Sequence, residues 1–189
     1  MSLVELIAQA DDRALAAGGL ACLDRCVPLL GGDDEVLRPL WTSLADGAVG
    51  ETWGESLEQA RAKLPALFEE PGEDEAVRLA RTMLAAAPLV PAGAEARAWA
   101  DACSLDSLRI HRLLEVMTPV GDADDVEGRR EGRTDDMSPL VAAELRRQIA
   151  VLELLAATGS GGLRQVLAVS TEGRRVLRAV VSRRARGRS

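Results

Sequence analysis

One stretch constrains the fold of this chain more than any other, the run SPLVAAELRRQIAVLELLAA at residues 138–157. Ser138 can cap a helix, Pro139 suits a first turn, and Gly159 follows the end of the run, so both ends of a helix are marked. Apolar residues recur on two sides of this helix at about 100° per residue. We therefore expect a central helix, packed by neighbours from more than one direction.

The two apolar sides of this helix predict which parts of the chain cover it. The first side holds Val141, Ala142, Leu145, Ile149, Leu152 and Ala156, and the second holds Leu140, Val151 and Leu154. We expect Leu145, Ile149 and Leu152 to face residues 1–120. The second side is expected to be covered by Leu163, Leu167, Leu177 and Val181. If Val151 and Leu154 were exposed in the monomer instead, they would be the predicted interface with a partner or with a second copy in a homodimer.

The composition favours helices over sheets. Of 189 residues 47% are apolar, but only 2% are aromatic, with no Tyr, one Phe and three Trp. A core of this kind is aliphatic and rich in Ala, which suits close helix packing, whereas strands draw on aromatic and β-branched residues. We predict an all-α fold, a single-domain irregular helical bundle of about seven to nine helices.

A short α-solenoid of helical-hairpin repeats is the alternative architecture. The segments GDDEVLRPLWTSLA at 32–45 and GEDEAVRLARTMLA at 72–85 match in seven positions at an offset of 40 residues. This offset lies in the range of two-helix repeats, although an acidic start before an amphipathic helix explains the same similarity.

Three regions are expected within the one domain. Residues 1–120 form a helical body, in which Gly18 and Gly19 are expected to allow close approach of a neighbour. Residues 121–137, GDADDVEGRREGRTDDM, have no apolar period and predict a flexible polar, acidic loop. Residues 138–189 hold the central helix and a basic C-terminal helical segment, predicted as two short helices, which must pack back on the body because 52 residues are too few for a core of their own.

Charge is distributed unevenly along the chain. Residues 1–163 carry 15 basic and 29 acidic side chains, whereas residues 164–189 carry eight basic and one acidic. The first residues, MSLVELIAQADD, predict no signal peptide, and no later run predicts a membrane span, so we expect a cytoplasmic protein. The leading hypothesis is a non-catalytic protein that acts through protein–protein interaction, either regulatory or an acidic inhibitor of a basic partner.

The basic tail supports a second hypothesis, a nucleic-acid-associated factor. The candidate contacts with phosphate are Arg183, Arg184, Arg186 and Arg188. The tail contains no aromatic residue for stacking on bases, so it predicts only an electrostatic contribution to binding.

A third hypothesis is a Cys/His metalloprotein or an enzyme. Cys22, Cys26, Cys103 and His111 have the residue types of a zinc site, and Cys103, His111 and Asp106 those of a thiol nucleophile with its base. Cys103 and His111 are about 12 Å apart along a continuous helix, so they could cooperate only if the helix breaks near Asp106. We expect such a break, because the alternative, an unpaired buried carboxylate, is costly. No phosphate-, dinucleotide- or zinc-binding motif is present, so we predict no metal, cofactor or catalytic residue.

Overall fold

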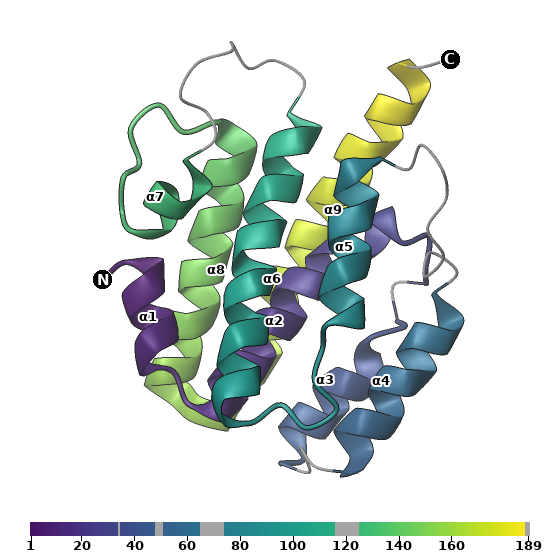
Figure 1. Cartoon of the computed structure of the whole chain (residues 1–189), viewed down its shortest axis with the longest axis vertical. Coiled ribbons are helices and arrows are strands. Elements are labelled where there is room, and N and C mark those ends of the chain that lie inside the picture. Colours follow the sequence, from purple (N-terminus) through teal and green to yellow (C-terminus); the bar gives the residue numbers. More distant parts are fainter. Residues whose placement is uncertain (34, 48–50, 65–73, 116–124, 188–189) are drawn as a thin grey trace.

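The computed structural model describes residues 1–33, 35–47, 51–64, 74–115 and 125–187, and these contain helices but no strand. Figure 1 shows an irregular bundle, which confirms the all-α prediction. The α-helices are α1 Leu3–Gln9, α2 Asp12–Cys26, α3 Arg38–Ala45, α4 Glu51–Lys63, α5 Glu75–Ala85, α6 Gly93–Leu114, α7 Val126–Arg130, α8 Pro139–Thr158 and α9 Leu163–Gly187. Two 3₁₀ turns, η1 Val27–Leu29 and η3 Gly159–Gly162, continue α2 and link α8 to α9.

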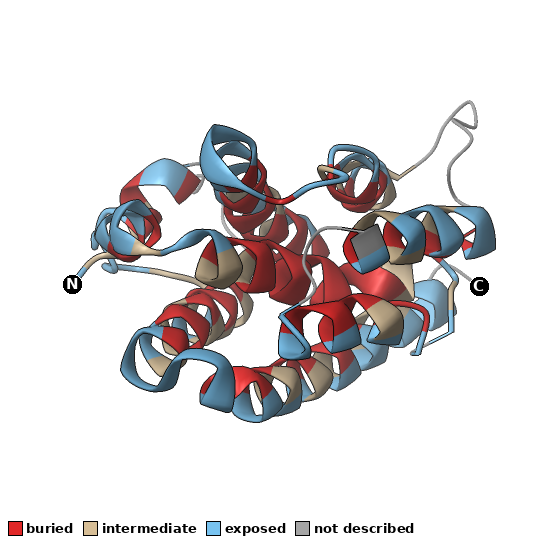
Figure 2. Cartoon of the chain, turned by 90° about the horizontal axis from the view of Figure 1, so that it is seen from below, coloured by how far each residue is buried: buried red, intermediate tan, exposed pale blue. Residues whose placement is uncertain are grey.

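Helix α2 shares the central position with α8. It packs against α3, α5, α6, α8 and α9, and α8 packs against α1, α2, α6 and α9. Buried residues line the inward sides of the helices (Figure 2). The reason for the position of α2 is its small side chains. A Cβ added to Gly19 would lie 2.7 Å from the ring of Trp99 in α6, so the expected close approach of a neighbour is confirmed there.

Helix α8 has the two covered sides that its sequence predicts. Val151 belongs to one buried cluster with Leu163 and Leu177, and Leu154 packs against that cluster. Leu145 and Leu152 belong to a second cluster with residues of α1, α2 and α6. Because Val151 is only 1% exposed, it offers no surface for a dimer or a partner in this fold.

Arginine side chains complete several helix C-termini. Arg13 donates to the carbonyls of Leu44 and Ala45 at the end of α3, and Arg97 donates to the Ile7 carbonyl at the end of α1. Arg61 donates to three carbonyls in and after the last turn of α5. Each contact adds a donor to carbonyls at a helix C-terminus and places a positive charge at the negative end of the helix dipole.

The predicted break at Asp106 is wrong, because α6 is continuous from Gly93 to Leu114. The Asp106 side chain keeps 15% of its surface exposed and lies 3.7 Å from the guanidinium of Arg109 one turn later. Burial raises the pKa of Asp106, and Arg109 offsets part of that effect. The partial exposure and the nearby cation together reduce the cost that favoured a break.

Other boundaries also differ from the predictions. Residues 163–187 form one helix rather than two, because Ser170 and Gly173 lie on its buried side instead of starting a new helix. The predicted loop contains α7, whose Val126 is buried against the core; its residues 121–124 lie outside the described part. Helix α3 starts at Arg38 but α5 starts at Glu75, so the two segments of the suggested repeat do not begin their helices at equivalent positions.

Candidate functional site

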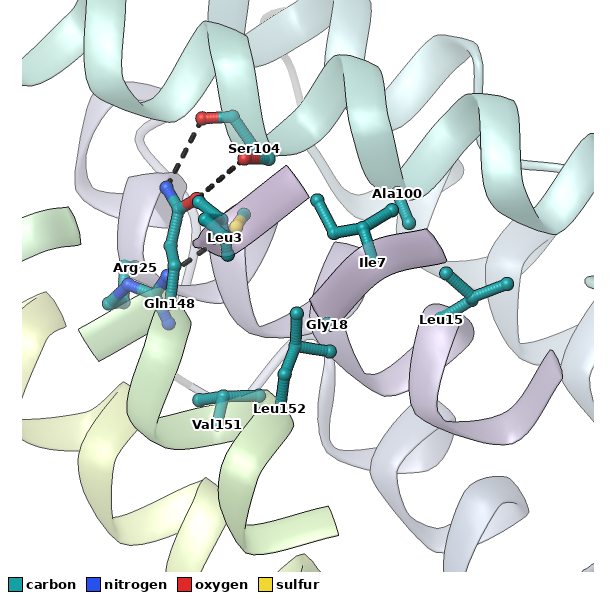
Figure 3. A pocket seen from close by; sticks show the side chains of 11 residues that line it. Leu3, Ile7, Leu15, Gly18, Arg25, Ala100, Ser104, Gln148, Val151 and Leu152 are labelled. Carbon is teal, nitrogen blue, oxygen red and sulfur yellow. Dashed lines mark hydrogen bonds between the residues drawn. The ribbon is translucent and has the colours of Figure 1, made fainter. Parts of the chain in front are cut away.

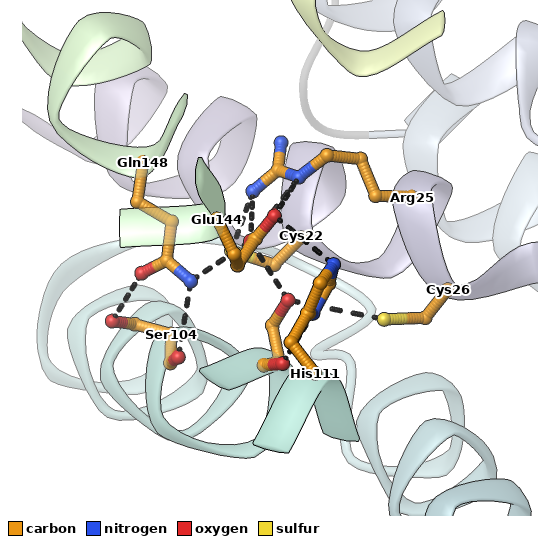
Figure 4. A network of polar contacts seen from close by, with 8 residues as sticks. Cys22, Arg25, Cys26, Ser104, His111, Glu144 and Gln148 are labelled. Atoms are coloured by element: carbon orange, nitrogen blue, oxygen red, sulfur yellow. Dashed lines mark hydrogen bonds and ion pairs between the residues drawn. The ribbon is translucent and has the colours of Figure 1, made fainter. Parts of the chain in front are cut away.

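Eight side chains from α2, α6 and α8 meet in the interior, and we call them the core polar cluster (Figure 4). Its members are Cys22, Arg25 and Cys26 from α2, Ser104, Ser107 and His111 from α6, and Glu144 and Gln148 from α8. Each member is at most 4% exposed. Three helices distant in sequence are therefore joined by polar contacts that solvent does not reach.

An ion pair between Arg25 and Glu144 forms the middle of the cluster. The Arg25 Nη2 and Nε atoms donate to the Glu144 carboxylate at 2.6 Å and 2.8 Å, so both carboxylate oxygens are engaged. Neither side chain has any exposed surface. A two-point contact of this kind fixes orientation as well as distance, and it holds α2 against α8.

Further donors surround the same carboxylate. The Ser107 hydroxyl donates to Glu144 Oε1 at 2.8 Å, and the Gln148 amide donates to it at 2.9 Å. Burial alone raises the pKa of Glu144, but the charge of Arg25 and the hydrogen bonds from Arg25 and Gln148 outweigh it and lower the pKa to about 2. Glu144 is therefore ionised at neutral pH.

His111 is neutral at the edge of the cluster. Its Nδ1 atom lies 2.7 Å from the Ser107 carbonyl, which can only accept, so Nδ1 carries the proton. Burial lowers the pKa of His111, and the nearby carboxylate of Glu144 offsets only part of that effect. The Nε2 atom lies 3.6 Å from Glu144 Oε2 and makes no hydrogen bond.

The cysteines are protonated thiols. Burial raises the pKa of Cys22 to about 12, and it also raises the pKa of Cys26 and of Cys103. Arg25 Nη2 donates a hydrogen bond to Cys22 Sγ at 3.4 Å, and Cys26 Sγ lies 3.9 Å from the Ser107 hydroxyl. Nucleophilic chemistry needs the thiolate, so these residues act as small buried side chains.

The structure brings together three of the four proposed zinc ligands, Cys22, Cys26 and His111, but not as a ligand set. Across the described ranges, no three Cys, His, Asp or Glu side chains are placed to hold a metal ion. Cys103 is fully buried on α6, and the unbroken helix keeps it away from His111. The proposed nucleophile and base therefore do not meet.

A narrow cavity adjoins the cluster beneath α1 (Figure 3). Its lining is mainly aliphatic, with Leu3 and Ile7 from α1 and Leu152 from α8, and Arg25 and Gln148 lie at its polar end. Among the described residues, the Nη1 atom of Arg25 has no hydrogen-bond partner. A buried donor beside a small cavity is a typical position for one ordered water molecule.

A second buried ion pair extends the network to α9. Arg174 donates to Asp24 at 2.7 Å, and both side chains are at most 8% exposed. Gly173 lies directly over Arg25, since an added Cβ would be 2.3 Å from Arg25 Cδ. Helix α9 thus packs over Arg25 and also contacts Arg147 of α8 at the same position.

The arginines predicted to bind phosphate have separate environments at the end of α9. Arg184 pairs with Asp74 at 3.4 Å and donates to the Leu113 carbonyl, and Arg183 bonds to a carbonyl of its own helix. Arg186 is exposed, and Arg188 lies outside the described residues.

Sequence reasoning missed Arg25, Ser107, Glu144 and Gln148 as members of a site. One signal was available, because Glu144 and Gln148 are four residues apart and share a helix side with Val141, Val151 and Leu155. Polar residues at that spacing on an apolar side indicate an internal hydrogen-bonding network.

The fold and the cluster together define an all-α bundle with a sealed ionic core. Searches of protein-family models, curated proteins and solved structures find no match to this chain. Among the helices that the structure describes, none combines the length and apolar character needed to cross a bilayer.

Proposed function

We propose that this chain is a non-catalytic protein that acts by contact with another protein, and that the contact surface lies on α9. The observation that carries the proposal is the α9 arginine face, which we define as Arg175, Arg178, Arg183 and Arg186. The partner surface that this face fits is acidic.

The α9 arginine face follows from the amphipathic pattern of the helix. Leu163, Val166 and Leu177 point to the core, and the four arginines recur on the opposite, exposed side at about 100° per residue. The one acidic residue of α9, Glu172, lies 3.9 Å from Arg147 of α8. A helix of 25 residues is about 37 Å long, which is long enough to span a protein–protein interface.

The remainder of the molecule has the opposite charge. Residues 1–163 carry a net charge of −14 and residues 164–189 a net charge of +7, so positive charge is concentrated on α9. A local excess of positive charge raises the rate of association with an acidic partner. The acidic body of this chain led to the expectation of a basic partner. In the proposed complex it lies next to any basic region that borders the acidic contact surface of the partner.

Nucleic acid is the second candidate ligand for the same face, since arginines also bind phosphate. Trp41, Trp53 and Trp99 are all at most 6% exposed, so none can stack on a base. This observation favours a protein.

Reversal of charge on the α9 arginine face is expected to abolish partner binding. The variant Arg175→Glu/Arg183→Glu/Arg186→Glu changes only exposed residues, so the fold should be retained. In quantitative pull-downs from a nuclease-treated native extract, we expect recovery of specific protein partners to fall at least about tenfold relative to wild type.

The matched control makes the same change in net charge elsewhere on the surface, with Lys63→Glu/Arg78→Glu/Arg146→Glu. It should recover the same partners as wild type. Equal losses in both variants would contradict a specific α9 interface. Loss of partners on nuclease treatment, with a salt-sensitive mobility shift of a DNA or RNA duplex that the α9 variant lacks, would establish the nucleic-acid alternative instead.

A further inference from the structure

A turn between α5 and α6, at residues 88–91, presents two aliphatic side chains to solvent. Leu89 is 52% exposed and Val90 57% exposed. The turn is held in place from both sides, because Trp53 Nε1 donates to the Pro88 carbonyl at 2.9 Å and Arg61 binds the last carbonyls of α5. A turn fixed in this way loses little conformational entropy on binding.

The surroundings of this turn are acidic. Asp12 accepts a hydrogen bond of 2.9 Å from Gly93 N, just after the turn, and Glu95 lies in the first turn of α6. Glu55 follows the glycine of α4 that contacts the Leu89 carbonyl. Arg61 of α4 binds the Ala87 carbonyl next to the turn, but its charge is paired with Glu58. Arg97 of α6 binds the Ile7 carbonyl at the end of α1.

A groove elsewhere on the molecule has the complementary character. It runs between α3 and the junction of η3 with α9, and its apolar surface comes from Trp41, Ala45, Leu163 and Leu167. Arg164 lies at its rim together with Arg38, which pairs with the exposed Glu35, and none of the described residues that line it is acidic. A Cβ added to Gly161, also in the lining, would meet no atom within 4 Å, so this wall is open.

We propose that the turn at residues 88–91 of one copy of this chain docks into the groove of a second copy. Leu89 and Val90 then lie on the apolar floor, and the acidic surroundings of the turn face Arg38 and Arg164 at the rim. The two surfaces are different parts of the chain, so the contact is head-to-tail and adds copies beyond two unless the arrangement closes into a ring. This assembly is independent of the α9 arginine face, which it leaves exposed.

The experiment uses two variants that each disable one surface. The turn variant is Leu89→Ser/Val90→Ser, and the groove variant is Arg164→Glu/Gln165→Glu. All four residues are exposed, and acidic residues suit the first turn of α9, so both variants should fold. Circular dichroism and urea midpoints equal to wild type are the check on folding.

Sedimentation velocity from about 10 µM to about 500 µM covers the range in which a weak contact becomes populated. Wild type should show an average mass that rises with concentration above 20.1 kDa, while each variant alone stays at 20.1 kDa. An equimolar mixture of the two variants should form a dimer but nothing larger, because one intact turn and one intact groove remain.

The head-to-tail contact is overturned if wild type stays monomeric over this range. It is overturned equally if either variant alone associates as wild type does, which indicates a different interface, or if the mixture of the two variants stays monomeric while wild type associates.

Discussion

Replacing Glu144 with alanine is expected to lower the free energy of unfolding by about 3–5 kcal/mol, because it leaves the charge of Arg25 buried without a partner. Both side chains of this pair are fully buried, so water cannot replace the carboxylate. A domain of this size has a total stability of about 5–15 kcal/mol. The loss is therefore a large fraction of the whole, and urea denaturation followed by circular dichroism measures it.

The matched control is Glu153→Ala on the same helix. Glu153 is exposed, and its removal should change the stability by no more than about 0.5 kcal/mol. If Glu144→Ala also cost less than about 1 kcal/mol, the Arg25–Glu144 pair would not have the central position that its geometry gives it.

The second large effect is loss of stability in acid, in two pH windows. The pKa of His111 in the folded state is below its ordinary value of 6.5, so below pH 6.5 the unfolded chain binds a proton that the folded chain does not bind. Stability should fall there by up to about 1.4 kcal/mol per pH unit until the folded pKa is reached. Glu144 acts in the same direction at lower pH. The pKa of its carboxyl group is about 2 in the folded state and 4.5 in the unfolded state. This difference contributes about 3 kcal/mol of stability, which is fully present above pH 4.5 and is lost as the pH falls towards 2.

The upper window can be assigned to one residue, because His111 is the only histidine in the chain. Wild type should lose stability between pH 6.5 and pH 5.5 because of His111. In the variant His111→Gln this loss should be absent, and only the smaller change due to carboxylates should remain. The single imidazole C–H resonance in a proton NMR titration gives the folded pKa directly. An inflection at pH 6.5 or above would show that His111 is not sealed in the core.

The fold class could be predicted because it depends on local patterns. The Ser2–Glu5 capping box is present, with Glu5 accepting from Ser2 N at 2.7 Å, and α8 has its two apolar sides covered as expected. These features need only neighbouring residues and the helical period. The same reasoning placed Asp106 at a break, because sequence alone does not show that the side chain stays partly exposed beside Arg109.

The core polar cluster could not be predicted for a related reason. A charged residue in a helix is ordinarily assigned to the solvent side, since burying it alone is costly. Glu144 is buried only because Arg25, 119 residues earlier, reaches it from another helix. No local pattern encodes that pairing. Arg25 and Arg174 form buried ion pairs in the same way, and Arg61 completes a helix end.

The central claim is that the core polar cluster has a structural role, while function depends on the α9 arginine face. The most direct measurement is partner recovery by the variant Arg25→Met/Glu144→Met, which replaces the ion pair with apolar side chains of similar volume. Such replacements are often neutral or stabilising, so the variant should fold. We predict that it recovers the same proteins as wild type in the nuclease-treated pull-down. A folded variant that had lost those proteins would contradict the claim and place function in the core.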